Sequence, residues 1–100
     1  MADLNIAEIP FESGEVRFRY SRYLGEDGTS WIRHGLFRAF HENGNLASEG
    51  SYVHGKEHGL WRDFHKNGQL AAHGAYEQGI EVGQWKYWDA DGNAERDETF

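Results

Sequence analysis

The stretch Gly35-Leu-Phe-Arg-Ala-Phe-His-Glu-Asn-Gly-Asn-Leu46 returns, with few changes, as Gly59-Leu-Trp-Arg-Asp-Phe-His-Lys-Asn-Gly-Gln-Leu70. The second stretch begins 24 residues after the first, and the same offset relates Tyr52 to Tyr76. A fixed period of roughly 20–50 residues is typical of stacked supersecondary units, each of which buries its apolar side chains against its neighbours. The chain of 100 residues is therefore interpreted as a repeat array rather than as a globular enzyme.

A third copy begins at Gly83 and ends with the chain. Its matches to the second copy are Trp85 to Trp61, Trp88 to Phe64, Gly92 to Gly68 and Phe100 to Tyr76. The period divides the chain into an N-terminal cap with a degenerate hairpin repeat at 1–34, repeats at 35–58 and 59–82, and a truncated repeat at 83–100. Together they form one structural domain.

Turn residues place a β-hairpin in each copy. Asn43-Gly44, Asn67-Gly68 and Asp91-Gly92 lie between short runs rich in aromatic residues, and such pairs tolerate the positive φ angles of tight hairpins. The sequence thus predicts an all-β array of consecutive antiparallel β-hairpins with a period of 24 residues.

The positions of the rings pose a question of parity. Trp61 and Phe64 are an odd number of residues apart, so a flat strand would send them to opposite faces. Either both faces are partly covered, or a bulge or strong twist brings the rings together. We prefer the second alternative.

The N-terminal third follows the pattern loosely. Val16, Phe18 and Tyr20 alternate with polar residues, and Gly25-Glu-Asp-Gly28 supplies a turn, so residues 14–33 are predicted to form a hairpin. The segment up to Ile9 has no clear period and is expected to pack as a lid.

Composition excludes several classes of function. Clustered Lys and Arg are needed to neutralise phosphates, so the net charge of −7 argues against nucleic acid and the lack of a polybasic stretch argues against a membrane surface. There is no cysteine, no run of about 18 apolar residues and no basic leader, which favours a cytoplasmic location. The net acidity serves solubility first, but it also permits a basic partner.

The pattern Gly-x-Trp-x-x-Phe-x-x-x-Gly-x-Leu, followed by Gly-x-Tyr-x-x-Gly, resembles the MORN repeat. The pattern looks like the bacterial variant in YwqK-type proteins, which are commonly labelled antitoxins. The resemblance covers Gly35–Phe100 well and residues 14–34 loosely. The resemblance implies that successive hairpins lie side by side in a single sheet, which is elongated, twisted and antiparallel throughout. Val82 and Ala94 depart from the pattern, since His and Leu stand at those positions in the other copies.

Nothing in the sequence forms a recognisable catalytic or metal-binding arrangement. His54 and His58 are four residues apart, but Gly55 and a turn lie between them and no third ligand follows at a fixed spacing, so solvated turn histidines are the preferred interpretation. His34 with His58, and His41 with His65, recur with the repeat and are expected to stack as ladders. We expect no enzyme activity, no cofactor and no metal.

Two classes of function stay open. The first is a non-catalytic module that binds and masks another protein, such as a basic toxin or a defence-system component, as an antitoxin, immunity protein or phage-type inhibitor does. The second is an assembly module that self-associates, as a homodimer for instance, through its open sheet face or its ends. For the first, aromatic residues framed by acids are the expected contacts, since Trp and Tyr dominate binding hot spots. These residues are Phe37, Trp61, Trp85, Trp88, Asp63, Asp89 and Asp91.

Overall fold

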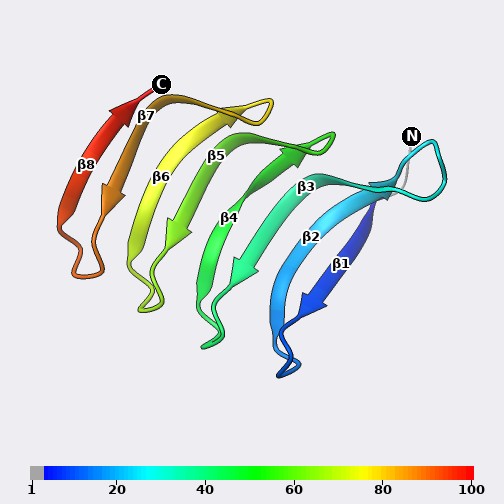
Figure 1. Ribbon diagram of the computed structural model, residues 1–100, viewed down its shortest axis with the longest axis horizontal. Coiled ribbons are helices and arrows are strands. Elements are labelled where there is room, and N and C mark those ends of the chain that lie inside the picture. Colours follow the sequence, from blue (N-terminus) through cyan, green and yellow to red (C-terminus); the bar gives the residue numbers. More distant parts are fainter. Residues whose placement is uncertain (1–3) are drawn as a thin grey trace.

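Eight antiparallel strands in chain order form a single open sheet in the computed structural model, which describes residues 4–100 (Figure 1). The strands are β1 (Asn5–Pro10), β2 (Val16–Leu24), β3 (Trp31–Phe40), β4 (Leu46–Val53), β5 (Lys56–Phe64), β6 (Leu70–Glu77), β7 (Ile80–Trp88) and β8 (Ala94–Thr99). The sheet measures 46 × 36 × 16 Å, which is one layer thick. The predicted all-β array of consecutive hairpins is confirmed, and the described residues contain no helix that could cross a membrane.

The turns within the hairpins share one geometry. In the β3–β4 turn, His41 N donates to Asn45 O over 2.8 Å and Gly44 N donates to His41 O over 2.9 Å, with Gly44 at a φ of 90°. This is a type I turn closed by a glycine in the left-handed region. The same two bonds recur at the other hairpin turns, including Phe11–Glu15 between β1 and β2.

A different turn joins one copy to the next. His54-Gly55 and Gln78-Gly79 have positive φ at both residues, with values of 48° and 86° and of 50° and 82°. Two successive positive φ angles define the tightest hairpin connection, which matches the right-handed twist of the strands. Figure 1 shows the two kinds of turn at opposite ends of the strands.

Each junction between copies carries a large bulge. Glu49 pairs with Arg62 and Ser51 with His58, so Gly50 alone lies opposite the three residues 59–61. The junctions β2–β3 and β6–β7 repeat this irregularity, with Ser21 and Gly74 in the place of Gly50. A bulge bends a strand and increases its local twist, so the sheet gains curvature once per repeat.

These bulges do not bring the two rings of a copy together. Trp61 lies on the face of the sheet that holds the core, which we call the aromatic face. Phe64 lies on the opposite face together with Arg62, whose guanidinium carbon is 5.9 Å from the centroid of the Phe64 ring. The chain alternates normally from Trp61 to Phe64 because the extra residue nearby, Ala71, is on β6. The preferred alternative of the sequence analysis was therefore wrong, and the rings are divided between the two faces.

The N-terminal third extends the same sheet. β2 and the start of β3 are the hairpin predicted at 14–33, with Leu24 opposite Trp31, but β3 continues unbroken to Phe40. Residues 5–10 form the edge strand β1 instead of a lid. Residues 1–3, the rest of the expected lid, lie outside the described residues.

Side chains connect neighbouring hairpins at the end of the sheet that carries the type I turns. His41 Nε2 donates to the carbonyl of Phe64 and His65 Nε2 to that of Trp88, each over 2.8 Å. Asn43 Nδ2 likewise donates to Lys66 O over 2.8 Å. The recurring turn histidines thus bond to the backbone of the next copy.

Neither expected histidine ladder is present among the described residues, because His41 and His65 bond to the backbone of the next copy instead of stacking on one another. His34 stacks on His54 with ring centroids 4.6 Å apart, and not on His58, which lies on β5 opposite Ser51. The reason is the junction turn, which brings His54 back over β3 so that its backbone N donates to His34 Nδ1 over 3.0 Å.

Candidate protein-binding surface

The core is a row of rings on the aromatic face. Phe37, Trp61 and Trp85 occupy the same position in successive copies and are 7%, 8% and 3% exposed. Phe37 packs on Trp61 with ring centroids 5.6 Å apart. In a sheet of one layer these rings have no second layer to cover them, so their burial comes from neighbouring side chains on the same face.

Two glycines allow the indoles to lie flat on the sheet. A Cβ at Gly50 would meet the ring of Trp61, and a Cβ at Gly74 would meet that of Trp85, in both cases at less than 3.0 Å. With the rings in this position, Trp61 Nε1 donates to Ser51 O and Trp85 Nε1 to Ala75 O, each over 3.2 Å. The indoles of Trp61 and Trp85 therefore pack directly on the backbone of Gly50 and Gly74.

Tyrosines fill the gaps between the buried rings and form the outer surface of this face. Tyr52 lies edge-on to Phe37 and Trp61, with both centroid distances 5.4 Å. Tyr76 bridges Trp61 and Trp85 in the same way, at 5.8 and 5.1 Å. Edge-to-face contacts of this kind contribute about 0.5–1.5 kcal/mol each beyond burial. The half-buried tyrosines are the part of the core that a partner can touch.

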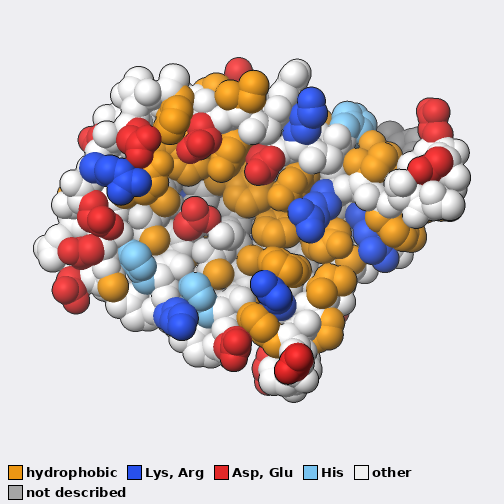
Figure 2. Space-filling view, in the orientation of Figure 1, with side chains coloured by type: hydrophobic (Ala, Val, Ile, Leu, Met, Phe, Trp, Pro, Cys, Tyr) orange, Lys and Arg blue, Asp and Glu red, His pale blue; other side chains and the backbone are white. Residues whose placement is uncertain are grey.

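Carboxylates surround these tyrosines on the C-terminal half of the face. Burial raises the pKa of Tyr76, and the nearby charges of Glu81, Glu57 and Asp63 raise it further. The pKa of Tyr87 is raised by burial and then by Glu98. Figure 2 shows hydrophobic side chains gathered across the middle of this face, with acidic side chains mostly over the C-terminal strands.

Cations lie on the N-terminal half of the same face. The guanidinium of Arg33 is 4.8 Å from the ring centroid of Tyr20, 5.5 Å from that of Phe37 and 5.4 Å from that of Tyr52. Arg22 stacks on Trp31 at 4.0 Å. The aromatic face is therefore electrically polarised along the array, from basic at β2–β3 to acidic at β5–β8.

The four aromatic residues expected from the sequence as protein contacts lie in two places. Phe37, Trp61 and Trp85 are core, and they present little surface. Trp88 is half-buried at the end of β7, where its carbonyl accepts the bond from His65.

The three acids expected as protein contacts also lie in two places, the aromatic face and the turn between β7 and β8. Asp63 lies on the aromatic face and accepts from Ser48 Oγ over 2.6 Å. Asp89 accepts from the backbone of Asp91 and Asn93 in its own turn, which lowers its pKa, and Asp91 is exposed in that turn. The sequence missed the tyrosines as the accessible layer, although the repeat of Tyr52 at Tyr76 was the available signal.

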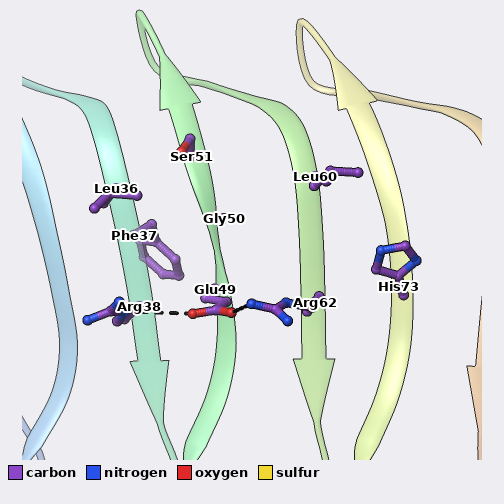
Figure 3. Close-up of a pocket in the computed structure, with 9 residues that line it drawn as sticks. All are labelled: Leu36, Phe37, Arg38, Glu49, Gly50, Ser51, Leu60, Arg62 and His73. Carbon is purple, nitrogen blue, oxygen red and sulfur yellow. Dashed lines mark hydrogen bonds and ion pairs between the residues drawn. The ribbon is translucent and has the colours of Figure 1, made fainter.

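The opposite face carries a feature that the sequence analysis did not find. One register position runs across all eight strands as Glu8, Arg19, Arg38, Glu49, Arg62, His73, Lys86 and Asp97, each paired with the next. Four of the ten Lys and Arg residues lie in this row. Glu49 is paired with both Arg38 and Arg62, as Figure 3 shows. We call this side the arginine face. Arg38, Arg62 and Lys86 stand one period of 24 residues apart, so the repeat was the available signal for them, whereas Arg19 joins the row only through the strand register.

Neither face brings metal-binding groups together. Within residues 4–100, no group of three His, Asp or Glu side chains is placed to hold a metal ion. His54 contacts the hydroxyl of Tyr23 over 2.8 Å in its turn.

A single-layer array of β-hairpin repeats, with buried rings along one face, is the class of protein that these observations define. The family model described as the MORN repeat variant matches residues 33–54 and 57–78, which correspond to the hairpins β3–β4 and β5–β6. The resemblance seen in the sequence is thus confirmed for two copies of the repeat. Searches of curated proteins and of solved structures returned no match.

Proposed function

We propose that this chain is a non-catalytic protein-binding module that acts in the cytoplasm by covering a surface of another protein, as an antitoxin, immunity protein or phage-type inhibitor does. The observation that carries the proposal is the half-exposed tyrosine row of the aromatic face with carboxylates around it. MORN repeats are commonly protein-binding or membrane-associated modules and are generally non-enzymatic, which supports a binding role.

The chemistry of the partner follows from the charges around Tyr76. Glu57, Asp63 and Glu81 all act on this ring, and none of them is in an ion pair with any of the described residues. Carboxylates that have no ion-pair partner and lie beside a large amphipathic ring suit a basic patch, because opposite charge speeds encounter while the ring supplies contact area. The proposed partner is therefore a protein with a basic surface.

The test is capture from the native host with matched variants. Glu57→Gln/Glu81→Gln removes two charges from the surface, and Glu12→Gln/Glu26→Gln removes two exposed charges elsewhere. The proposal is supported if the wild type and the Glu12→Gln/Glu26→Gln control retain a basic protein as the salt concentration rises, while Glu57→Gln/Glu81→Gln loses it. Retention of no basic protein, or equal retention by both pairs at every salt concentration, rejects it.

Self-association is the second candidate, and the free edge of β1 favours it. Leu4, Ile6 and Ile9 are exposed there beside unpaired backbone groups, and such an edge can pair with another strand. Sedimentation equilibrium distinguishes the two candidates. A dimer that Ile6→Lys dissociates would favour assembly over partner binding.

A further inference from the structure

The arginine face alternates large and small side chains along one row. Ile6 pairs with Ser21, Leu36 with Ser51 and Leu60 with Ala75. The three aliphatic side chains are 57%, 66% and 70% exposed. Large residues on every second strand, with small ones between them, leave a series of sockets.

Two of these sockets are open hollows one repeat apart. The first, of about 220 Å³, is lined by Ile6, Ser21 and Leu36 on one side and by Arg19 and Arg38 on the other. The second, of about 410 Å³, is lined in the same manner, as Figure 3 shows, by Leu36, Ser51, Leu60, Arg38, Glu49, Arg62 and His73. Each hollow therefore has an aliphatic wall and a wall with two arginines, and in the second hollow Glu49 lies between those arginines.

The spacing of the sockets matches a helix laid across the strands. One repeat is two strands, and strands are about 4.8 Å apart, so the sockets recur about every 10 Å. Residues i and i+7 of an α-helix are about 10.5 Å apart on the same side. Residues i and i+3 of an extended strand span about 10 Å but point to opposite sides. A helix with an apolar residue at every seventh position fits both sockets.

The charged row that contains Arg38, Glu49 and Arg62 determines which charge the flank of that helix should carry. Arg38 and Arg62 lie two residues beyond Leu36 and Leu60, about 7 Å along the strands, which is within the width of one helix. Their side chains are 55% and 53% exposed, whereas Glu49 between them is 20% exposed. The cations therefore present outward groups to a ligand, and carboxylates on the helix flank complement them.

We propose that the arginine face is a docking groove for an acidic amphipathic α-helix of a partner protein, lying across β1–β6 with its apolar side chains in the sockets. This goes beyond the function proposed above, which rests on the opposite face.

A synthetic helix tests the proposal directly. The probe is a fluorescent peptide of about 21 residues with Leu at every seventh position, Glu on the adjoining flank and Ala elsewhere. Its controls are the same peptide with Lys in place of Glu and the same peptide with one central Pro, which breaks the helix. We expect the acidic helix to bind in the micromolar range, and both controls to bind at least tenfold more weakly.

Variants of the groove give effects of opposite sign. Leu36→Ser weakens binding about tenfold, and Arg38→Gln weakens it severalfold and reduces its salt dependence. Glu49→Gln tightens binding, because it frees two arginines from an internal carboxylate. Ile80→Ser, an equally exposed aliphatic residue outside the groove, leaves binding unchanged. All of these side chains except that of Glu49 are exposed, and thermal melting checks that each variant folds.

Several results would overturn the proposal. They are no binding of the acidic helix at about 100 μM, equal binding of the Pro or Lys peptide, weaker binding by Glu49→Gln, or equal effects of Leu36→Ser and Ile80→Ser. Binding to phosphatidylserine vesicles without binding to the peptide would assign the face to a lipid surface instead. Because Glu57→Gln/Glu81→Gln leaves this groove intact, that variant must still bind the peptide even if the function proposed for the aromatic face fails.

Discussion

Gly74→Ala tests the packing of the core through a single added methyl group. Gly74 has no positive φ, so the backbone accepts alanine, and in a strand this change alone would stabilise by about 0.5–1 kcal/mol. The added Cβ would, however, meet three atoms of the Trp85 ring at less than 3.0 Å. The sign of the effect therefore shows which of the two factors dominates.

The magnitude follows from what Trp85 loses when its ring moves. Overpacking in a well-filled core costs about 1–3 kcal/mol, and the lost bond from Trp85 Nε1 to Ala75 O costs about 1 kcal/mol more. After subtraction of the gain of about 0.5–1 kcal/mol from alanine in a strand, we expect a net destabilisation of about 1–3.5 kcal/mol. For a domain of this size, that lowers Tm by roughly 5–25 °C.

Urea and thermal denaturation followed by circular dichroism measure this effect. The matched control is the pair Trp85→Leu and Trp85→Leu/Gly74→Ala, because in the smaller background the methyl group has room and should cost nothing further. A Gly74→Ala protein as stable as the wild type, or an equal loss in both backgrounds, would refute the account of the indole lying flat on the glycine.

Four further outcomes are expected. Gly68→Val places a β-branched residue at a φ of 90° and should cost more than about 1 kcal/mol in urea denaturation, and unchanged melting would contradict the turn assignment. Deletion of residues 95–100 removes most of β8 and uncovers the edge of β7, so gel filtration should show association, and a stable monomer would be inconsistent with the pairing. Bonds from the Ser30 hydroxyl and then from the backbone of residues 29 and 30 lower the pKa of Asp27, so its contribution to stability is present above about pH 4 and is lost as the pH falls through the lowered value. Asp27→Asn should accordingly be less sensitive to acid between pH 4 and pH 2 than the wild type, and parallel urea midpoints for the two proteins would contradict this. Asp89→Asn/Asp91→Asn should keep the fold and slow association with a basic partner in stopped-flow measurements at low salt, and a rate unaffected by the substitutions or by salt would remove their role in steering.

The period made most of the fold predictable. Gly35 to Leu46 and Gly59 to Leu70 repeat too closely to adopt different structures, and the Asn-Gly pairs fix where each hairpin turns. Phe100 was expected at the position of Tyr76, and its backbone N donates to Gly83 O over 2.9 Å at the closing strand. Local turn chemistry and repetition were sufficient for these features.

The bulges and the rows they align were not predictable in the same way. The place of Gly50 opposite three residues of β5 depends on how two copies pair, and a pattern along one strand does not contain that information. β1 was missed because it is short, carries Pro10 and lacks clear alternation. Arg38 and Arg62 recur with the period, but the placement of Arg19 and Glu49 in the same row appears only once the register between distant residues is known.

Repeated residues on the two faces of the sheet contribute differently to folding. Trp61 and Trp85 recur because each must fill a gap over a bulge glycine, so folding accounts for their identity. Leu36 and Leu60 recur equally well, yet side chains that are two-thirds exposed bury little area against the sheet and contribute little to its stability. In the third copy, Gln84 occupies the position that Leu36 and Leu60 hold in the first two copies. Its strand still pairs with β8, and Trp85 is still buried. The third copy therefore folds without an aliphatic residue at this position, and this supports the docking groove that we propose for Leu36 and Leu60 beside the arginines.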